Sequence, residues 1–203
     1  MSGPDIAFWQ QRFDAGQPPW DRGGASPRLS TWLAEDVLRP CSIAVPGCGS
    51  GHEVAVLAQA GFDVTAIDYA PGAVSATEQR LKQAGVSAQI VQADVLDWQP
   101  ASPLDAIYEQ TCLCALHPDH WVAYGAQLHR WLRPGGQLAL LAMQALREGS
   151  RAGRIEGPPY HVDIHALRAL LPSRDWDWPR PPFDTEVHPT NGWFELALVL
   201  HRR

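Results

Sequence analysis

The chain is 203 residues long and carries 22 acidic against 16 basic residues, a net charge of −6. This length suits one domain with its own core, and an acidic balance without a basic stripe argues against a nucleic-acid partner. No apolar run approaches the roughly 20 residues of a membrane span, no signal-peptide pattern opens the chain, and four cysteines make no disulfide framework, so we expect a cytoplasmic protein. We also expect a monomer whose partner is a small molecule.

The first segments of the chain predict two short helices. A helix at residues 6–15 places Trp9 and Phe13 four positions apart, so both side chains lie on one face. An irregular loop follows. The serine and proline at 26–27 are typical of an N-cap and a first helical turn, and they predict a second helix that extends to Val37.

Residues 43–51 read IAVPGCGSG, and the next apolar run, VTAID, ends in Asp68. This pattern indicates the strand, turn and helix that open a doubly wound nucleotide-binding fold, although a glycine turn in an unrelated α/β protein is the alternative. Gly47, Gly49 and Gly51 let the backbone turn sharply against a ligand, and an acid at Asp68 suits two ribose hydroxyls. The G-x-G-x-G spacing lacks the third glycine of the dinucleotide fingerprint, which favours S-adenosylmethionine (SAM).

Beyond residue 41, predicted strands and helices alternate. We expect helices at 53–60, 71–84, 121–132 and 164–171, and strands at 43–45, 64–68, 88–92, 104–108, 137–142, 185–188 and 193–201. Alternation predicts a mostly parallel sheet, and the last two strands resemble an antiparallel hairpin. The expected fold is α/β: a Rossmann-like class I SAM-methyltransferase domain over 1–203, with seven strands, a helical lid at 1–40 and a core at 41–203.

In such a sheet the ligand lies across the carboxyl ends of the strands. Those ends supply Tyr69 after Asp68, Asp94 with Val95 after the third strand, and Gln110 after the fourth. Asp94 is placed to accept a hydrogen bond from an adenine amino group while Val95 packs on the base. The alternative is that Asp94 caps a helix.

Two other residue pairs allow a functional and a structural interpretation. Trp9 and Phe13 either cover the positive sulfonium of SAM by cation–π attraction or simply pack on the core. Cys112 and Cys114 form a CxC with histidines nearby, which raises a zinc site. Alternate residues of an extended segment face opposite ways and no second ligand cluster exists, so we expect no metal.

Several segments follow one another in the order typical of a known family: FWQQRFDAGQPPWDRGGASP, VPGCGSGHEVAVLA, AIDYAPGAV, QADVLDW, TCLCAL, LRPGGQL and EGPPYHVDIHAL. Together they resemble the thiopurine S-methyltransferase superfamily, and most of all its thiol/halide branch, the plant "harmless to ozone layer" proteins. The resemblance covers nearly the whole chain. It implies a cytosolic SAM-dependent enzyme that methylates soft nucleophiles, namely thiols, thiopurines, thiocyanate, bisulfide or halides, and releases S-adenosylhomocysteine (SAH).

The resemblance also implies roles for individual residues. Phe13 stands where the family usually has tryptophan, and Gln110 where thiopurine enzymes have arginine and the plant branch tyrosine. Tyr160, in GPPY, matches a tyrosine of the acceptor pocket, with a packing tyrosine as the alternative. The expected catalytic residues are Tyr160 and Asp21, and the expected cofactor-binding residues are Trp9, Phe13, Trp20, Gly47, Gly49, Gly51, Asp68, Tyr69, Asp94, Val95 and Gln110.

The expected reaction is an in-line displacement that depends on orientation and desolvation more than on a strong base, because a thiol pKa is about 8.5. Asp21 either accepts a proton, holds a cationic acceptor or caps its loop. Around TCLCAL and GPPY the sequence shows no fixed cation. The alternatives are a methyltransferase with an oxygen or nitrogen acceptor, a non-catalytic SAM-binding protein, a nicotinamide oxidoreductase and a nucleic-acid amino-methyltransferase.

Overall fold

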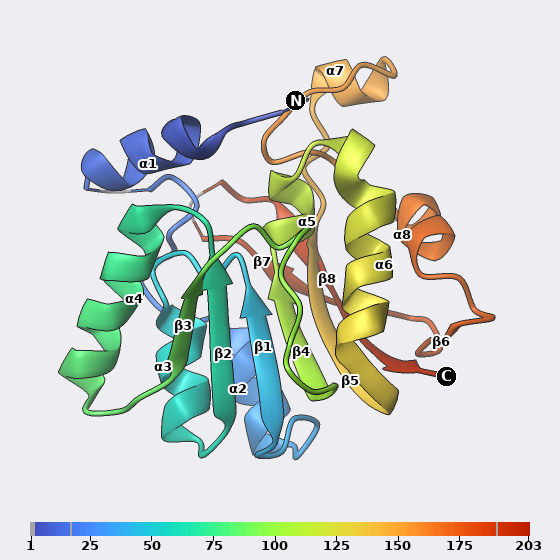
Figure 1. Cartoon of the computed structure of the whole chain (residues 1–203). Helices are drawn as coiled ribbons and strands as arrows, with labels where there is room; N and C mark the ends of the chain where they lie inside the picture. Colours follow the sequence, from blue (N-terminus) through green and yellow to red (C-terminus); the bar gives the residue numbers. More distant parts are fainter. Residues whose placement is uncertain (1–2, 17, 190) are drawn as a thin grey trace. The chain divides into compact units, whose positions relative to one another are not determined.

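The computed structural model describes residues 3–16, 18–189 and 191–203, which form two compact units. The N-terminal unit is Asp5–Trp98, and the C-terminal unit is Gln99–Arg203 with Gly3 and Pro4. Figure 1 shows the helices and strands of both units. Across the described part of the chain, every helix is too short or too polar to cross a membrane.

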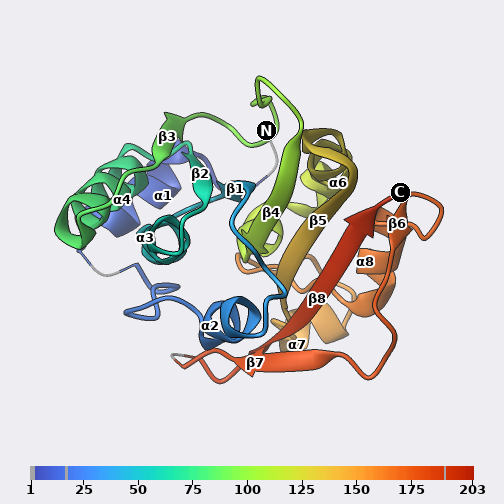
Figure 2. The same cartoon turned by 90° about the horizontal axis from the view of Figure 1, so that it is seen from below.

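The N-terminal unit contains a parallel sheet in the order β3-β2-β1, formed by β1 (Ser42–Pro46), β2 (Asp63–Asp68) and β3 (Gln89–Gln92). The connecting helices α3 (His52–Gln59) and α4 (Pro71–Ala84) pack against each other and against these strands (Figure 2). The glycine loop therefore joins β1 to α3, and Asp68 ends β2, as the sequence predicts.

Two helices precede this sheet. Asp5 caps α1 (Ile6–Asp14) because its side chain accepts a hydrogen bond from the Phe8 N–H, and α1 packs against α4. Ser26 caps α2 (Pro27–Ala34) in the predicted way, by accepting from the N–H of the second helical residue. Helix α2 ends at Ala34, so the prediction that it reaches Val37 is wrong.

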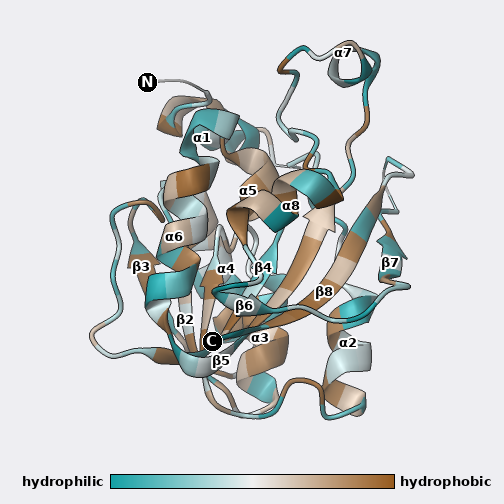
Figure 3. Cartoon of the chain, turned by 90° about the vertical axis from the view of Figure 1, so that its right-hand side faces the viewer, coloured by the Kyte–Doolittle hydropathy of each residue, from teal (hydrophilic) through white to brown (hydrophobic). Residues whose placement is uncertain are grey.

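The C-terminal unit is built on β4 (Leu104–Gln110), which pairs in parallel with β5 (Leu132–Met143). Antiparallel to β5 runs β8 (Phe194–Arg202), which also pairs with β6 (Trp176–Asp177) and β7 (Asp184–Val187). Figure 3 shows hydrophobic residues along β5 and β8 and a hydrophilic β7. The antiparallel β7–β8 pair confirms the predicted hairpin, while the two-residue strand β6 was not predicted.

Helices α6 (Trp121–Trp131) and α8 (Ile164–Leu170) pack side by side in the C-terminal unit. Three short helices have no counterpart in the prediction: α5 (Cys112–Ala115), η1 (Pro118–His120) and α7 (Glu148–Arg151). The CxC segment, expected to be extended, is the helix α5, and both of its thiols are buried. Strand β5 begins directly after α6, five residues earlier than predicted, with a register shift in its pairing to β4.

Candidate functional site

The glycine loop after β1 lies against the carboxylate that ends β2. The Gly49 N–H donates to Asp68 Oδ2 at 3.1 Å, and the Ala70 N–H donates to Oδ1 at 3.0 Å. Gly47 and Gly49 have φ angles of 60° and 55°, which glycine adopts without strain. A carboxylate accepts about four hydrogen bonds, so each oxygen of Asp68 keeps capacity for a ligand hydroxyl.

Opposing effects act on the charge of Asp68. Burial raises the pKa of the carboxyl, and the backbone N–H donors of Ala70, Gly49 and Tyr69 lower it. These donors stabilise the ionised form in a partly buried place. Asp68 therefore offers a positioned acceptor of the kind that binds a pair of hydroxyl groups.

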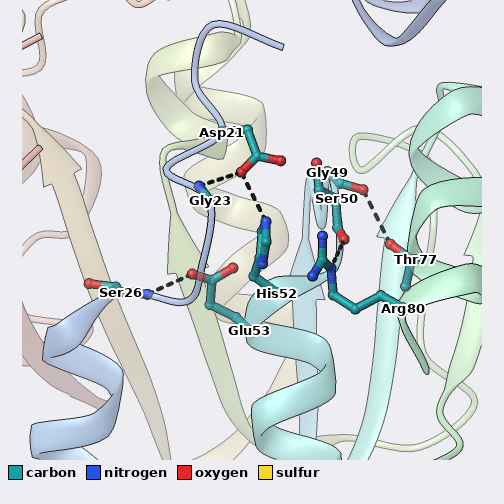
Figure 4. A network of polar contacts seen from close by, with 9 residues as sticks. All are labelled: Asp21, Gly23, Ser26, Gly49, Ser50, His52, Glu53, Thr77 and Arg80. Carbon is teal, nitrogen blue, oxygen red and sulfur yellow. Dashed lines mark hydrogen bonds and ion pairs between the residues drawn. The ribbon is translucent and has the colours of Figure 1, made fainter. Parts of the chain in front are cut away.

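Helix α4 fixes the conformation of the same loop. A Cβ on Gly51 would lie 2.6 Å from Thr77 Oγ1, so only glycine allows this close approach. Thr77 Oγ1 donates to the Gly49 carbonyl at 3.2 Å, and Arg80 Nε donates to the Ser50 carbonyl at 2.6 Å (Figure 4). Gly51 thus serves the packing of the loop on α4, whereas Gly49 faces Asp68.

Asp21 belongs to a polar network that ties its loop to the first turn of α3 (Figure 4). Its Oδ1 accepts from the Gly23 N–H at 2.7 Å and contacts His52 Nε2 at 2.9 Å, while the Ser26 N–H donates to Glu53 Oε1 at 3.0 Å. Burial raises the pKa of Asp21, but hydrogen bonds from Ser50, Gly23 and His52 bring it below its usual value. These contacts agree with the alternative in which Asp21 caps its own loop.

The aromatic side chains of the first two segments form a cluster. The Trp20 ring lies edge-on to Trp9 at 5.1 Å and to Phe13 at 5.7 Å between centroids. A Cβ on Gly49 would lie 3.6 Å from Trp20 Nε1, so the indole of Trp20 lies beside the glycine loop. The structure therefore brings the three predicted lid aromatics to the loop that faces Asp68.

Helix α1 is fastened to the start of α4. Gln10 Oε1 accepts a hydrogen bond from the Gly72 N–H at 2.8 Å. A Cβ on Gly72 would lie 2.4 Å from Phe13 Cβ, so this glycine allows the helices to touch. Trp9 hydrogen-bonds the Tyr69 hydroxyl. Helix α1 is thus held by both hydrogen bonds and close packing.

Asp94 and Val95 follow β3 in a turn. Asp94 Oδ1 accepts from the Leu96 N–H at 2.8 Å, and its carbonyl accepts from the Trp98 N–H at 2.9 Å. Asp94 therefore caps a turn, and no helix follows it. Val95 is buried. Burial, and then the charges of Asp68 and Asp94, raise the pKa of Tyr69, which places this phenol near both acids.

A cavity of about 550 Å³ lies between α1, the segment before Asp21 and α4. Phe13, Asp21, Ser50, Gly72 and Arg80 contribute to its lining. Neither Asp68 nor Asp94 lines it. It is therefore a space beside α1 and does not include the residues predicted to bind the nucleoside.

In the C-terminal unit, the GPPY segment holds Tyr160. The Tyr160 N–H donates to the Cys114 carbonyl at 2.7 Å, and its ring lies edge-on to His117 at 5.4 Å. A Cβ on Gly157 would lie 2.4 Å from Tyr160 Cδ1, so the glycine of GPPY makes room for the ring. Tyr160 is 6% exposed, and burial raises its pKa, so the hydroxyl stays a proton donor.

Gln110 is oriented within the same unit. The Tyr108 hydroxyl donates to Gln110 Oε1 at 2.8 Å, and Gln110 Nε2 donates to Glu195 Oε2 at 3.4 Å. Both ends of this amide thus have partners in the protein. Gln110 and Tyr160 belong to the C-terminal unit, whereas the other predicted site residues belong to the N-terminal unit.

Sequence reasoning missed a buried acid beside Gln110. Glu109 is 0% exposed, and its Oε1 accepts from the Leu113 N–H at 2.6 Å and from the Tyr124 hydroxyl at 3.4 Å. Burial, reinforced by the charge of Glu195, raises the pKa of Glu109 to about 8. The available signal was an acid that directly follows the apolar residues Ala106, Ile107 and Tyr108 of β4.

Sequence reasoning also missed a cation at GPPY. Arg147 Nη1 donates to the Pro159 carbonyl at 2.7 Å and Nη2 to the Pro158 carbonyl at 3.2 Å. The expectation that no fixed cation lies near GPPY is therefore wrong. Arg147 lies in the segment between β5 and α7. No local sequence pattern predicts its contacts, because its partners Pro158 and Pro159 belong to another segment. No group of three possible metal ligands occurs among the residues that the structure describes.

Comparison with known proteins decides the family. The family model described as thiopurine S-methyltransferase matches residues 5–178. The chain belongs to this family. It is 27% identical over 173 residues to the probable thiol methyltransferase 2 of Arabidopsis thaliana, across 84% of this chain and 74% of the relative. It is 32% identical over 187 residues to the thiopurine S-methyltransferase of Azotobacter vinelandii, across 83% and 82%.

Solved structures confirm the fold of this thiopurine S-methyltransferase family member. The 1,6-didemethyltoxoflavin-N1-methyltransferase of Burkholderia thailandensis matches with a TM-score of 0.74 and 20% identity, across 97% of this chain and 86% of that chain. The N-methyltransferase NodS of Bradyrhizobium japonicum matches with a TM-score of 0.72 and 19% identity, across 96% and 98%. The fold is that of class I SAM-dependent methyltransferases. Family and fold confirm that the chain is a SAM-dependent S-methyltransferase.

Proposed function

We propose that this enzyme transfers the methyl group of SAM to a small soft nucleophile: a thiol, thiopurine, bisulfide, thiocyanate or halide. The family match over residues 5–178 carries the proposal. Relatives named for thiol, thiocyanate and thiopurine methylation support the acceptor class. The contacts of Asp68 support the cofactor, because they present a carboxylate beside a glycine loop.

The N-terminal unit fits the parts of SAM one by one. Asp68 suits the ribose hydroxyls, and the backbone of Gly47 and Gly49 allows close approach. The carboxylate of Asp94, whose Oδ1 accepts from the Leu96 N–H, suits the adenine amino group through its other oxygen. The apolar side chain of Val95 suits the base. When bound, SAM supplies a methyl group that its positively charged sulfur has already activated.

The lid aromatics and Tyr69 complete this proposed site. The rings of Trp9, Phe13 and Trp20 attract a sulfonium by cation–π interaction, worth about 0.5–2 kcal/mol, and they exclude water. Phe13 gives a weaker cation–π contribution than a tryptophan would. Helix α1 carries two of these rings and is held on α4 by Gln10. The lid therefore orders the sulfonium end of the ligand.

Acceptor activation needs little from the protein. A thiol with a pKa of about 8.5 is partly ionised at neutral pH, so catalysis rests on orientation and desolvation. We assign Tyr160 to the acceptor, because its buried ring is wedged against Gly157 and its hydroxyl remains a donor. For Asp21 we favour loop anchoring over proton transfer, since its Oδ1 is engaged by Gly23 and His52.

The remaining proposals concern the setting of the enzyme. We propose a single catalytic domain with residues 1–40 as a lid on a core at 41–203. We further propose a cytoplasmic monomer that binds small molecules and no nucleic acid or membrane. Four free cysteines and a net charge of −6 support this setting.

An acceptor screen tests the function. The purified chain is incubated with SAM and iodide, thiocyanate, bisulfide, small thiols or thiopurines, with catechol and adenine-containing DNA as oxygen and nitrogen acceptors, and SAH is quantified. We expect SAH formation with at least one sulfur or halide acceptor and none with catechol or DNA. An oxygen or nitrogen acceptor with a higher kcat/KM than every soft acceptor would overturn the proposal.

A further inference from the structure

We propose that Arg147 selects anionic acceptors by fixing a positive charge beside Tyr160. This inference rests on the proposed function, because it concerns the acceptor that Tyr160 meets. The acceptor then binds in its negatively charged form. Arg147 lies in the segment between β5 and α7, drawn in orange in Figure 1.

First, the guanidinium of Arg147 contacts backbone carbonyls. Arg147 Nη1 donates to the carbonyls of Pro159 at 2.7 Å and Glu156 at 3.3 Å, and Nη2 donates to the carbonyl of Pro158 at 3.2 Å. Within the described residues, every hydrogen-bond partner of this guanidinium is an uncharged carbonyl, and no carboxylate lies within ion-pair distance. Its positive charge is therefore not neutralised by an ion pair within the described residues.

The second observation is how rigidly the charge is held. The guanidinium carbon of Arg147 lies 5.0 Å from the centroid of the Trp193 ring. An arginine that contacts an aromatic ring and donates through a planar fork loses little further freedom when it meets a ligand. Arg147 is also partly exposed, so it remains accessible to a small anion.

The third observation links this charge to the acceptor residue. Pro159 directly precedes Tyr160, and the Tyr160 N–H bonds to the Cys114 carbonyl at 2.7 Å. Burial, then the charges of Glu109 and Glu195, raise the pKa of the Cys114 thiol, and the charge of Arg147 acts in the opposite direction. The field of Arg147 therefore reaches the residues that position Tyr160.

A fixed positive charge at this place favours negatively charged acceptors over neutral ones. Thiolates, bisulfide, thiocyanate and iodide carry a negative charge, whereas catechols and thioethers are neutral when they reach the enzyme. An anion that leaves water pays a desolvation cost, which a fixed cation offsets where water is partly excluded. A guanidinium is weakly hydrated and so suits large polarisable anions. The protonated hydroxyl of Tyr160 adds a donor.

A purely structural role makes different predictions. If Arg147 only braces the GPPY segment, its loss disturbs Tyr160 for charged and neutral acceptors alike. In that case lysine, which lacks the planar fork, replaces arginine poorly. If the charge selects the acceptor, lysine retains most of the binding, because it keeps the charge.

The test is calorimetric titration of thiocyanate and iodide into the SAH complex of the wild-type chain, Arg147→Lys, Arg147→Met and Arg168→Met. Arg168 is the matched control, because its guanidinium carbon lies 4.7 Å from the Trp178 ring in the same unit. We expect Arg147→Met to weaken anion binding at least about tenfold, Arg147→Lys by less than about threefold, and Arg168→Met not at all. Circular dichroism and the SAH dissociation constant report whether each variant is folded.

Kinetics with one thiol across pH 6 to 9 gives a second readout. We expect Arg147→Met to lower kcat/KM most where the thiolate predominates. Equal anion binding by the wild type and Arg147→Met, or no anion binding by the wild type, would overturn the role of Arg147. Anion binding that depends on Arg147 without turnover of any soft acceptor would sustain the anion site and reject the proposed function.

Discussion

Asp68 and Glu109 occupy similar places in the two units, yet they have different surroundings. Each lies at the carboxyl end of a parallel strand, β2 and β4, and burial raises the pKa of each. Asp68 receives one backbone N–H on each oxygen and remains partly exposed beside the glycine loop. Glu109 is fully buried, its Oε1 accepts from the Leu113 N–H and the Tyr124 hydroxyl, and the charge of Glu195 acts on it.

This comparison shows that an acid at a strand end gains its role from its neighbours. Backbone donors stabilise the ionised form of Asp68, which is then ready to accept ligand hydroxyls. Glu109 also accepts hydrogen bonds that lower its pKa, but complete burial and the charge of Glu195 outweigh them, so the fold favours its protonated form. The N-terminal unit thus presents a charge, whereas the C-terminal unit buries a neutral acid and presents Tyr160 and Arg147.

The largest effect is expected when the carboxylate of Asp68 is removed. Asp68→Ala should weaken SAM and SAH binding by about 2–3 kcal/mol, because charge-assisted hydrogen bonds to ribose are lost. Calorimetry measures the dissociation constants. Asp63→Ala, at the exposed start of the same strand, is the control and should bind normally. An unchanged dissociation constant in a folded Asp68→Ala variant would remove Asp68 from the site.

The buried carboxyl of Glu109 should make the stability of the protein depend on pH. The pKa of Glu109 is raised from 4.5 to about 8, so between these values the folded state keeps a proton that the unfolded state releases. The free energy of unfolding should therefore fall as pH rises through this window, by about 1–2 kcal/mol from pH 6 to 8. Glu109→Gln should flatten this fall in urea titrations.

Exposed Glu148 supplies the control for that experiment. Glu148→Gln should keep the wild-type dependence of stability on pH. If Glu109→Gln also keeps it, Glu109 is ionised in the folded state and the contrast with Asp68 disappears.

The close fit of α1 on α4 predicts a smaller effect. A Cβ on Gly72 would lie 2.4 Å from Phe13 Cβ, so Gly72→Ala should displace α1 and weaken SAH binding about five- to tenfold. Gly24→Ala is the control, because a Cβ there meets nothing within 4 Å. Fluorescence titration of the nine tryptophans reports both binding constants. Equal affinities would show that the lid does not contribute to binding.

The smallest effect is expected at Tyr160. Tyr160→Phe should lower kcat a few-fold through the loss of about one hydrogen bond, while the SAM dissociation constant stays within about twofold. Steady-state kinetics with a soft acceptor and calorimetry separate the two quantities. A loss of SAM affinity without a change in kcat would place Tyr160 on the cofactor side.

Sequence reasoning succeeded where the signals are local. The bounds of α4, 71–84, were predicted correctly, because a proline starts the helix and a glycine with φ of 67° ends it. The strand–glycine–helix unit was predicted with bounds that differ by one residue at each end, and Asp68 ends β2 as predicted. The aromatic spacing of Trp9 and Phe13 predicted a shared face, and both rings contact Trp20.

Sequence reasoning failed where distant residues decide the structure. Helix α5 follows Thr111, whose φ of 62° is unusual for a residue other than glycine, and no local pattern announces it. The partners of Arg147 depend on how GPPY folds back, and the pKa of Glu109 depends on Tyr124 and Glu195 from other elements. The surroundings of Glu109 and Arg147 were therefore harder to predict than those of Asp68.

Hydrogen exchange of the wild-type chain with and without SAH tests the central claim most directly, because it compares both units in one experiment. We propose that the cofactor binds in the N-terminal unit, under α1. We therefore expect SAH to slow exchange in α1, in residues 47–51 and in the first turn of α4, more than in residues 146–162. Slowed exchange confined to 146–162, with α1 unchanged, would contradict this placement of the cofactor.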